Sequence, residues 1–134
     1  MGDRERRLDD FTGDWQMQRD IRHADGGRAR FEGAARLEVA GDGLAYREEG
    51  MLLIPGQPAI KAGRRYRWGP DLSVFFDNGR FFHRIPPEGG ETGHWCDPDT
   101  YRGQYDFSSW PVFTVRWQVT GPRKNYQSVT TYRR

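Results

Sequence analysis

"LSVFFDNGRFFHRI", residues 72–85, carries the strongest structural signal in this sequence, because it reads as two short strands joined by a tight turn. An Asn-Gly pair, here at 78–79, is the favoured centre of a two-residue type I′ turn between antiparallel strands. The predicted register pairs Asp77 with Arg80, Phe76 with Phe81, and Val74 with His83. The face that we expect to point inward carries Leu72, Val74, Phe76, Phe81, His83 and Ile85.

The same period of two recurs along the chain, with apolar residues at alternate positions. Glycine- and proline-rich turns separate the segments, as at "PGQP" (55–58). No segment shows the period of an amphipathic helix. The sequence therefore predicts an all-β fold of roughly eight to ten strands. Closure into a single antiparallel up-and-down β-barrel would remove the exposed strand edges.

Length and composition favour one soluble domain. The 134 residues suit a single domain spanning 1–134, with residues 1–10 as an N-terminal extension or short helix. Aromatic residues make up 14% of the chain, which argues against disorder. The net charge of +2 is small and its basic residues are scattered, so we expect no nucleic-acid partner.

The sequence also predicts a cytoplasmic location. No apolar run reaches membrane-spanning length, and the N-terminal residues lack the apolar core of a secretion signal, so no membrane partner is expected. Cys96 is the only cysteine, which excludes an internal disulfide.

"FTGDW" (11–15) resembles the Gly-x-Trp signature of lipocalins and other calycins. In those barrels the tryptophan closes one end and a basic residue from the far end of the chain covers it. The resemblance assigns these parts to Gly13 and Trp15. It names three candidates for the covering residue: Arg123, Lys124 and Arg133.

Nearly the full chain resembles an uncharacterised bacterial family of lipocalin-like proteins, known only as a domain of unknown function. Besides "FTGDW", the resemblance rests on "DGLAYREEG" (42–50), "NGRFFH" (78–83), "HWCDPDTY" (94–101) and "GPRKNY" (121–126). It implies a lipocalin-like fold and supplies no catalytic residues.

Several polar residues fall on faces that the alternation predicts to be inward: Arg19, Glu48, Arg64 and His83. An unpaired buried charge costs several kcal/mol, so the two arginines and the glutamate should meet one another or a ligand. One interpretation is an ion network that fixes strand register. The other is a site for an anionic ligand, because two arginines exceed one carboxylate. Arg64-x-Tyr66 also resembles the Arg-x-Tyr pair with which intracellular fatty-acid-binding barrels hold a carboxylate.

"HWCDPDTY" (94–101) raises the alternatives of a metal site and a reactive thiol. His94 and Cys96 share a strand face, and His83 with Asp99 or Glu48 could complete a ligand set. No CxxC, HxxxH or HExxH spacing is present, so we expect no metal and no cofactor. A nucleophilic thiol would need His94 to lower its pKa. The plainer interpretation is a turn at 97–100 that places Cys96 opposite Tyr101 in the barrel wall.

The leading functional hypothesis is a barrel that binds a small, partly apolar, anionic molecule. Its predicted ligand-binding residues are Arg19, Glu48, Arg64, Tyr66, His83, His94 and Tyr101. One alternative is an isomerase or cyclase that uses His83, His94 and Glu48 as acid and base. Others are a metal- or haem-binding barrel, and an interaction protein or homodimer that meets its partner through outward Phe75, Phe82 and Trp95.

Overall fold

A computed structural model describes residues 5–134, which form a short 3-10 helix and a 10-stranded antiparallel sheet. The elements are η1 (Leu8–Phe11), β1 (Gly13–His23), β2 (Arg28–Ala40), β3 (Gly43–Leu53), β4 (Ile60–Trp68), β5 (Ser73–Phe76), β6 (Phe81–Arg84), β7 (Gly90–Cys96), β8 (Asp99–Asp106), β9 (Phe113–Thr120) and β10 (Asn125–Arg133). Of the predicted N-terminal extension, residues 1–4 lie outside the described part of the chain.

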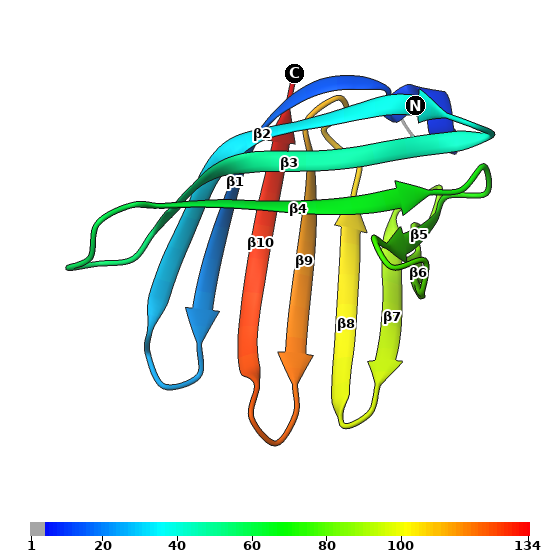
Figure 1. Ribbon diagram of the computed structural model, residues 1–134. Helices are drawn as coiled ribbons and strands as arrows, with labels where there is room; N and C mark the ends of the chain where they lie inside the picture. The colour runs from blue at the N-terminus through cyan, green and yellow to red at the C-terminus, as the bar shows by residue number, and fades with distance from the viewer. Residues whose placement is uncertain (1–4) are drawn as a thin grey trace.

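The sheet curls into a nearly closed barrel, as the strand pattern predicts. Its order is β6-β5-β4-β3-β2-β1-β10-β9-β8-β7, so every neighbouring pair is consecutive in the chain except β1 and β10. The long strands β2, β3 and β4 cross in front of β10, β9 and β8, which closes the interior between them (Figure 1).

The remaining join, between β6 and β7, has no ladder of backbone hydrogen bonds among the described residues. There the Thr92 hydroxyl donates to the Arg84 carbonyl oxygen at 2.8 Å. We call this join the β6–β7 seam.

A pair of glycines lets β2 and β3 bend sharply. Gly33 and Gly50 face each other across the two strands, and a Cβ atom on either would overlap a carbonyl oxygen of the opposite strand. Close approach of two backbones is a known use of glycine within strands. In Figure 1, β2 leaves the direction of β1 and turns across the barrel. The bend therefore wraps half of the sheet over the other half.

The hairpin of β5 and β6 follows only part of the predicted register. Val74 pairs with His83 as expected, but Phe75, not Phe76, pairs with Phe81. The loop has three residues, closed by the Phe76 amide donating to the Arg80 carbonyl oxygen at 2.8 Å, with Gly79 at φ 87°. Three-residue loops of this kind are the next most common after the two-residue type.

This shift exchanges the two phenylalanines of β6. A bulge leaves Phe82 without a strand partner, and its ring is buried at 8% exposure, whereas Phe81 is 50% exposed. The predictions that Phe81 faces inward and Phe82 outward are therefore wrong, because a one-residue change of register reverses the faces. Of the proposed outward patch, Trp95 is exposed and Phe75 is half-buried.

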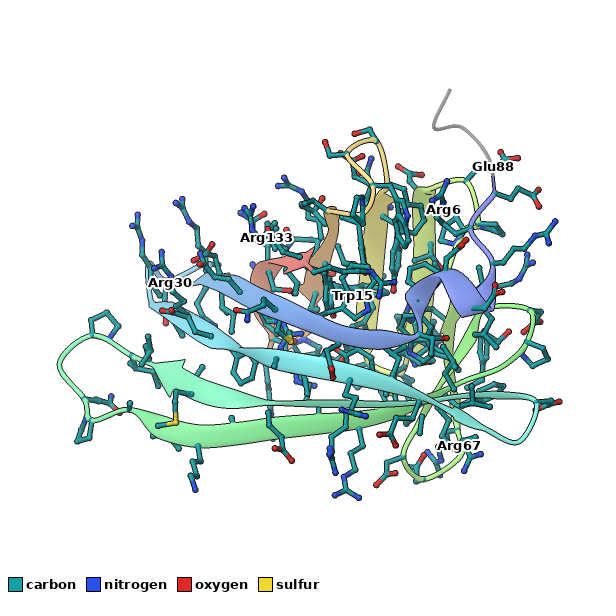
Figure 2. All side chains as sticks on the ribbon, turned by 90° about the horizontal axis from the view of Figure 1, so that it is seen from above. Arg6, Trp15, Arg30, Arg67, Glu88 and Arg133 are labelled. Carbon is teal, nitrogen blue, oxygen red and sulfur yellow. The ribbon has the colours of Figure 1, made fainter. Side chains whose placement is uncertain are left out.

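The end of the barrel next to the N-terminal segment is closed by aromatic rings. The Trp15 indole N–H donates to the Phe11 carbonyl oxygen at 2.9 Å. The Phe11 ring is fully buried and meets three further rings edge-on, those of Trp68, Trp110 and Phe113. Figure 2 looks onto this end and labels Trp15, which belongs to the N-terminal strand β1. The closed end therefore forces any ligand to enter elsewhere.

The basic cover of Trp15 is Arg134, whereas the resemblance named Arg123, Lys124 or Arg133. The Arg134 guanidinium lies 4.0 Å from the centre of the Trp15 ring and donates to the carbonyl oxygens of Thr12, at 3.0 Å, and Asp10. A Cβ atom on Gly13, which has φ 116°, would approach Arg134 to 3.2 Å. Strand alternation explains the correction, because Arg133 follows the buried Tyr132 and points outward.

Replacing Arg134 by alanine is expected to lower the free energy of unfolding by about 1–2 kcal/mol, through loss of the cation–π contact and the charged hydrogen bonds. Arg133→Ala is the matched control, since it removes the same charge from an exposed neighbouring position and should change stability by less than about 0.5 kcal/mol. Urea unfolding of both variants checks this. Equal losses would show that Arg134 does not brace the closed end.

Candidate functional site

The barrel encloses a cavity of about 270 Å³, whose lining includes the exposed Arg64. Ligand pockets usually measure about 300–1,000 Å³, so this volume lies just below the usual range and suits only a small molecule. The sequence has six tyrosines, and all of them line the cavity: Tyr46, Tyr66, Tyr101, Tyr105, Tyr126 and Tyr132. The wall therefore offers flat aromatic surface and several hydroxyl groups.

An ion pair stands at the centre of this wall. Arg19 Nη1 donates to Glu48 Oε2 at 2.7 Å, and Nη2 donates to Oε1 at 3.1 Å. Arg19 Nε also donates to the Thr130 hydroxyl at 2.9 Å. The Arg19 and Glu48 side chains are 9% and 1% exposed, so this is a buried bidentate pair.

Two tyrosines complete the network. The Tyr46 hydroxyl donates to Glu48 Oε1 at 2.6 Å, and it lies 2.8 Å from the Tyr132 hydroxyl. Because Tyr46 donates to the carboxylate, Tyr132 is the donor in the second bond. The chain of donors thus ends on Glu48, whose oxygens are satisfied by the protein itself.

The charges in this network are fixed at neutral pH. Burial raises the pKa of the Glu48 carboxyl, but the hydrogen bond and charge of Arg19, with the Tyr46 hydroxyl, outweigh it and leave that pKa below its ordinary value. Burial lowers the pKa of Arg19, but the hydrogen bond and the charge of Glu48 outweigh it and raise that pKa above its ordinary value. Burial raises the pKa of Tyr132 to about 12. Arg19 is therefore cationic, Glu48 anionic and Tyr132 neutral.

Arg64 differs from the other two charged residues of the wall. It pairs with Glu48 across β3 and β4, yet it is exposed, and no hydrogen bond or ion pair joins it to another described residue. Its charge helps to lower the pKa of Glu48. Of the three charges predicted to meet, Arg19 and Glu48 neutralise each other. Arg64 remains as a positive charge at the edge of the cavity.

His83 and Tyr105 form a second polar pair in the wall. His83 Nε2 lies 2.7 Å from the Tyr105 hydroxyl oxygen, and both side chains are buried. Burial, with the nearby His94 as a smaller contribution, lowers the pKa of His83 to about 3. The imidazole is therefore neutral at physiological pH and acts as a hydrogen-bonding group.

A stack of rings fills the wall between these polar groups. The Phe82 ring is stacked on Phe76, with centroids 4.6 Å apart, and on Trp117, with centroids 5.0 Å apart. Tyr66 also stacks on Phe82. These rings make this part of the wall apolar. An apolar wall of this kind suits a ligand with an aromatic or other apolar part.

The predicted site residues separate into two groups. Six of them line the cavity: Arg19, Glu48, Arg64, Tyr66, His83 and Tyr101. His94 does not, although its ring packs against those of Phe82 and Tyr101 from β7. Cys96 is exposed and pairs with Asp99, so the predicted pairing of Cys96 with Tyr101 is wrong. His94 takes that place opposite Tyr101, because the turn contains only Asp97 and Pro98.

Several cavity residues escaped the sequence analysis, namely Tyr105, Tyr126, Ser128, Thr130 and Tyr132. Tyr105 shares its face with Tyr101, so alternation alone could have identified it. The other four alternate along β10, and their inward position follows once β10 is known to pair with β1.

Neither a metal centre nor a membrane-spanning helix is found among the residues described. No cluster of three or more His, Cys, Asp or Glu side chains within 5–134 has a geometry that could hold a metal ion. No helix in this part of the chain is long and apolar enough to cross a membrane.

Fold and cavity together define a lipocalin-like barrel with a polar, aromatic interior. The chain belongs to the family of unknown function DUF6314, which matches residues 11–134. No curated protein matches the sequence.

Among solved structures, the barrel is similar to the S-type phycobiliprotein lyase CPES from Guillardia theta. The two chains are 11% identical, the match covers 95% of this chain and 89% of that one, and the TM-score is 0.66. At this identity the likeness establishes the fold alone.

Proposed function

We propose that this protein binds a small, partly apolar anion inside its barrel, with Arg64 as the residue that attracts the negative charge. The proposal rests on the charged residues of the cavity, two of which pair with each other while the third does not. Arg19 and Glu48 neutralise each other, whereas Arg64 faces the same space without an acidic partner among the described residues. An arginine without a partner at the mouth of an aromatic cavity favours a carboxylate, sulfonate or phosphate group.

Tyr66, Tyr101 and His83 are proposed to contact the rest of the ligand, since they share the cavity wall with Arg64. In this proposal Arg19 and Glu48 serve the site indirectly, because their network holds β1, β3 and β10 together. The acid–base enzyme gains no support from Glu48, whose oxygens already accept bonds from Arg19 and Tyr46. We retain a cytoplasmic location as part of the proposal, with the small molecule as the partner.

The test uses two fluorescent probes of matched shape, anionic 1-anilinonaphthalene-8-sulfonate and its uncharged counterpart N-phenyl-1-naphthylamine. Arg64→Leu is expected to weaken binding of the sulfonate by about tenfold or more, because a charged hydrogen bond contributes about 1.5–3 kcal/mol. Binding of the uncharged probe should be unchanged. Fluorescence titration measures both affinities, and native mass spectrometry of the purified protein shows whether it retains an organic anion.

Arg65→Leu is the matched control, because Arg65 is the next residue of β4 and does not line the cavity. It should leave both affinities within about twofold of the wild-type values, a difference of about 0.4 kcal/mol. If the two substitutions weaken sulfonate binding equally, the attraction is a general surface charge effect and the site at Arg64 is wrong.

A further inference from the structure

One polar atom in the cavity wall has no partner within the described chain. His83 Nδ1 is buried and makes no hydrogen bond, although Nε2 of the same ring is bonded to Tyr105. Buried polar atoms are almost always satisfied, so an exception needs an explanation. Because the His83 side chain lines the cavity, a ligand bound in the cavity is the partner that we consider for Nδ1.

The bond to Tyr105 determines what Nδ1 offers. Either atom of this bond can be the donor, but the Tyr105 hydroxyl has no other hydrogen-bond acceptor among the described residues. We therefore assign its proton to the bond with Nε2, which leaves the proton of the neutral imidazole on Nδ1. Nδ1–H is then a hydrogen-bond donor without an acceptor. An uncharged oxygen, such as a hydroxyl or a carbonyl, satisfies it without bringing a charge into the buried wall.

His83 and Arg64 occupy different depths of the cavity. The Tyr105 ring meets Phe107, which in turn meets Phe11 at the closed end, so the His83–Tyr105 pair lies deep. Arg64 is exposed and belongs to the mouth. Apolar rings surround the deeper of the two groups. The His83 imidazole packs against Phe82, with centroids 4.3 Å apart, and against Trp117, with centroids 4.8 Å apart.

We propose that the ligand is a flat acid with polar groups at both ends: an anionic group at Arg64, a ring against Phe82 and Trp117, and an oxygen that accepts a hydrogen bond from His83 Nδ1. This inference rests on the proposed function. Nδ1 is closed off from water. The ligand oxygen therefore reaches it by displacing the edge of one neighbouring ring.

The experiment compares two acids that differ by one hydroxyl group, 6-hydroxy-2-naphthoate and 2-naphthoate. The wild-type protein should bind the hydroxy acid about tenfold or more tightly, since a site built to bond a hydroxyl discriminates against the analogue that lacks it. His83→Phe should bring the ratio of the two affinities close to one. His23→Phe, which alters an exposed histidine outside the cavity wall, should leave the ratio unchanged. Isothermal titration calorimetry gives each affinity.

A second measurement needs no substitution. In long-range ¹H–¹⁵N spectra of the wild-type protein, the Nδ1 signal of His83 should shift with the hydroxy acid and stay in place with 2-naphthoate. Equal affinities for the two acids, no binding of either, or an unmoved Nδ1 signal would each overturn the inference. These failures differ from failure of the proposed function, in which the anionic and uncharged naphthyl probes do not distinguish Arg64→Leu from the wild type.

Discussion

Replacing Glu48 by leucine is expected to lower the free energy of unfolding by about 3–5 kcal/mol, which is the usual cost of removing one partner of a buried ion pair. The substitution leaves Arg19 as a buried cation whose remaining bond is to Thr130. It also removes the acceptor of the Tyr46 hydroxyl. Urea unfolding at neutral pH measures the loss.

The double variant Arg19→Met/Glu48→Leu should recover most of this stability, because well-packed apolar residues often replace a buried ion pair at little cost. Glu49→Leu is the control, since the neighbouring Glu49 side chain is 73% exposed and paired with the surface residue Arg47. Exposed pairs contribute about 0–1 kcal/mol. If Glu48→Leu costs no more than Glu49→Leu, the network does not stabilise the barrel.

Acidification is expected to destabilise the protein well before its carboxylates protonate. His83 has a pKa of about 3 in the folded protein against an ordinary value of 6.5, so between these values the unfolded chain binds a proton that the folded one does not. Stability must therefore fall as the pH decreases from 6.5, by about 1.4 kcal/mol per pH unit for one group. The effect fades above pH 6.5, because the imidazole of the unfolded chain also becomes neutral there.

Denaturant unfolding between about pH 7 and pH 5.5 isolates this contribution, because Glu48 is almost fully ionised in both states over that range and adds little slope. His83→Gln should flatten the slope, since a glutamine can bond to Tyr105 without titrating. His23→Gln, at an exposed position, should preserve the wild-type slope. The titratable side chains that affect the His83 imidazole are Tyr105, through its hydrogen bond, and His94, through its charge. A slope that persists in His83→Gln would assign the acid sensitivity to another residue.

Strand alternation predicted much of the barrel but only part of its interior. Residues such as Arg19 and Glu48 could be placed inside because β1 and β3 are regular strands, whose faces follow the sequence without interruption. Phe82 could not, because a three-residue loop and a bulge changed the register of β6. Loop length depends on backbone geometry that the Asn-Gly pair alone does not determine.

The different roles of Arg19 and Arg64 also could not be predicted from the sequence. Both alternate inward, and their different roles depend on which one lies within reach of Glu48 in three dimensions. Arg134 was not predicted as the residue that covers Trp15. It lies past the end of β10 and turns back over the Trp15 ring, where strand alternation no longer applies.

The β6–β7 seam is the part of the wall where the diameter of the barrel is least constrained by hydrogen bonds. Elsewhere around the described wall, widening the barrel means breaking rows of backbone hydrogen bonds, whereas at the seam the Thr92 hydroxyl bond is the polar tie to Arg84. Phe82 stands on one side of this join and His94 on the other, with their rings 5.4 Å apart. Under the proposed function, the thickness of a ligand next to the seam is therefore limited by the packing of these two rings and not by backbone hydrogen bonds of the sheet. Under the proposed function, we expect chemically related ligands of unequal bulk to bind in the same barrel.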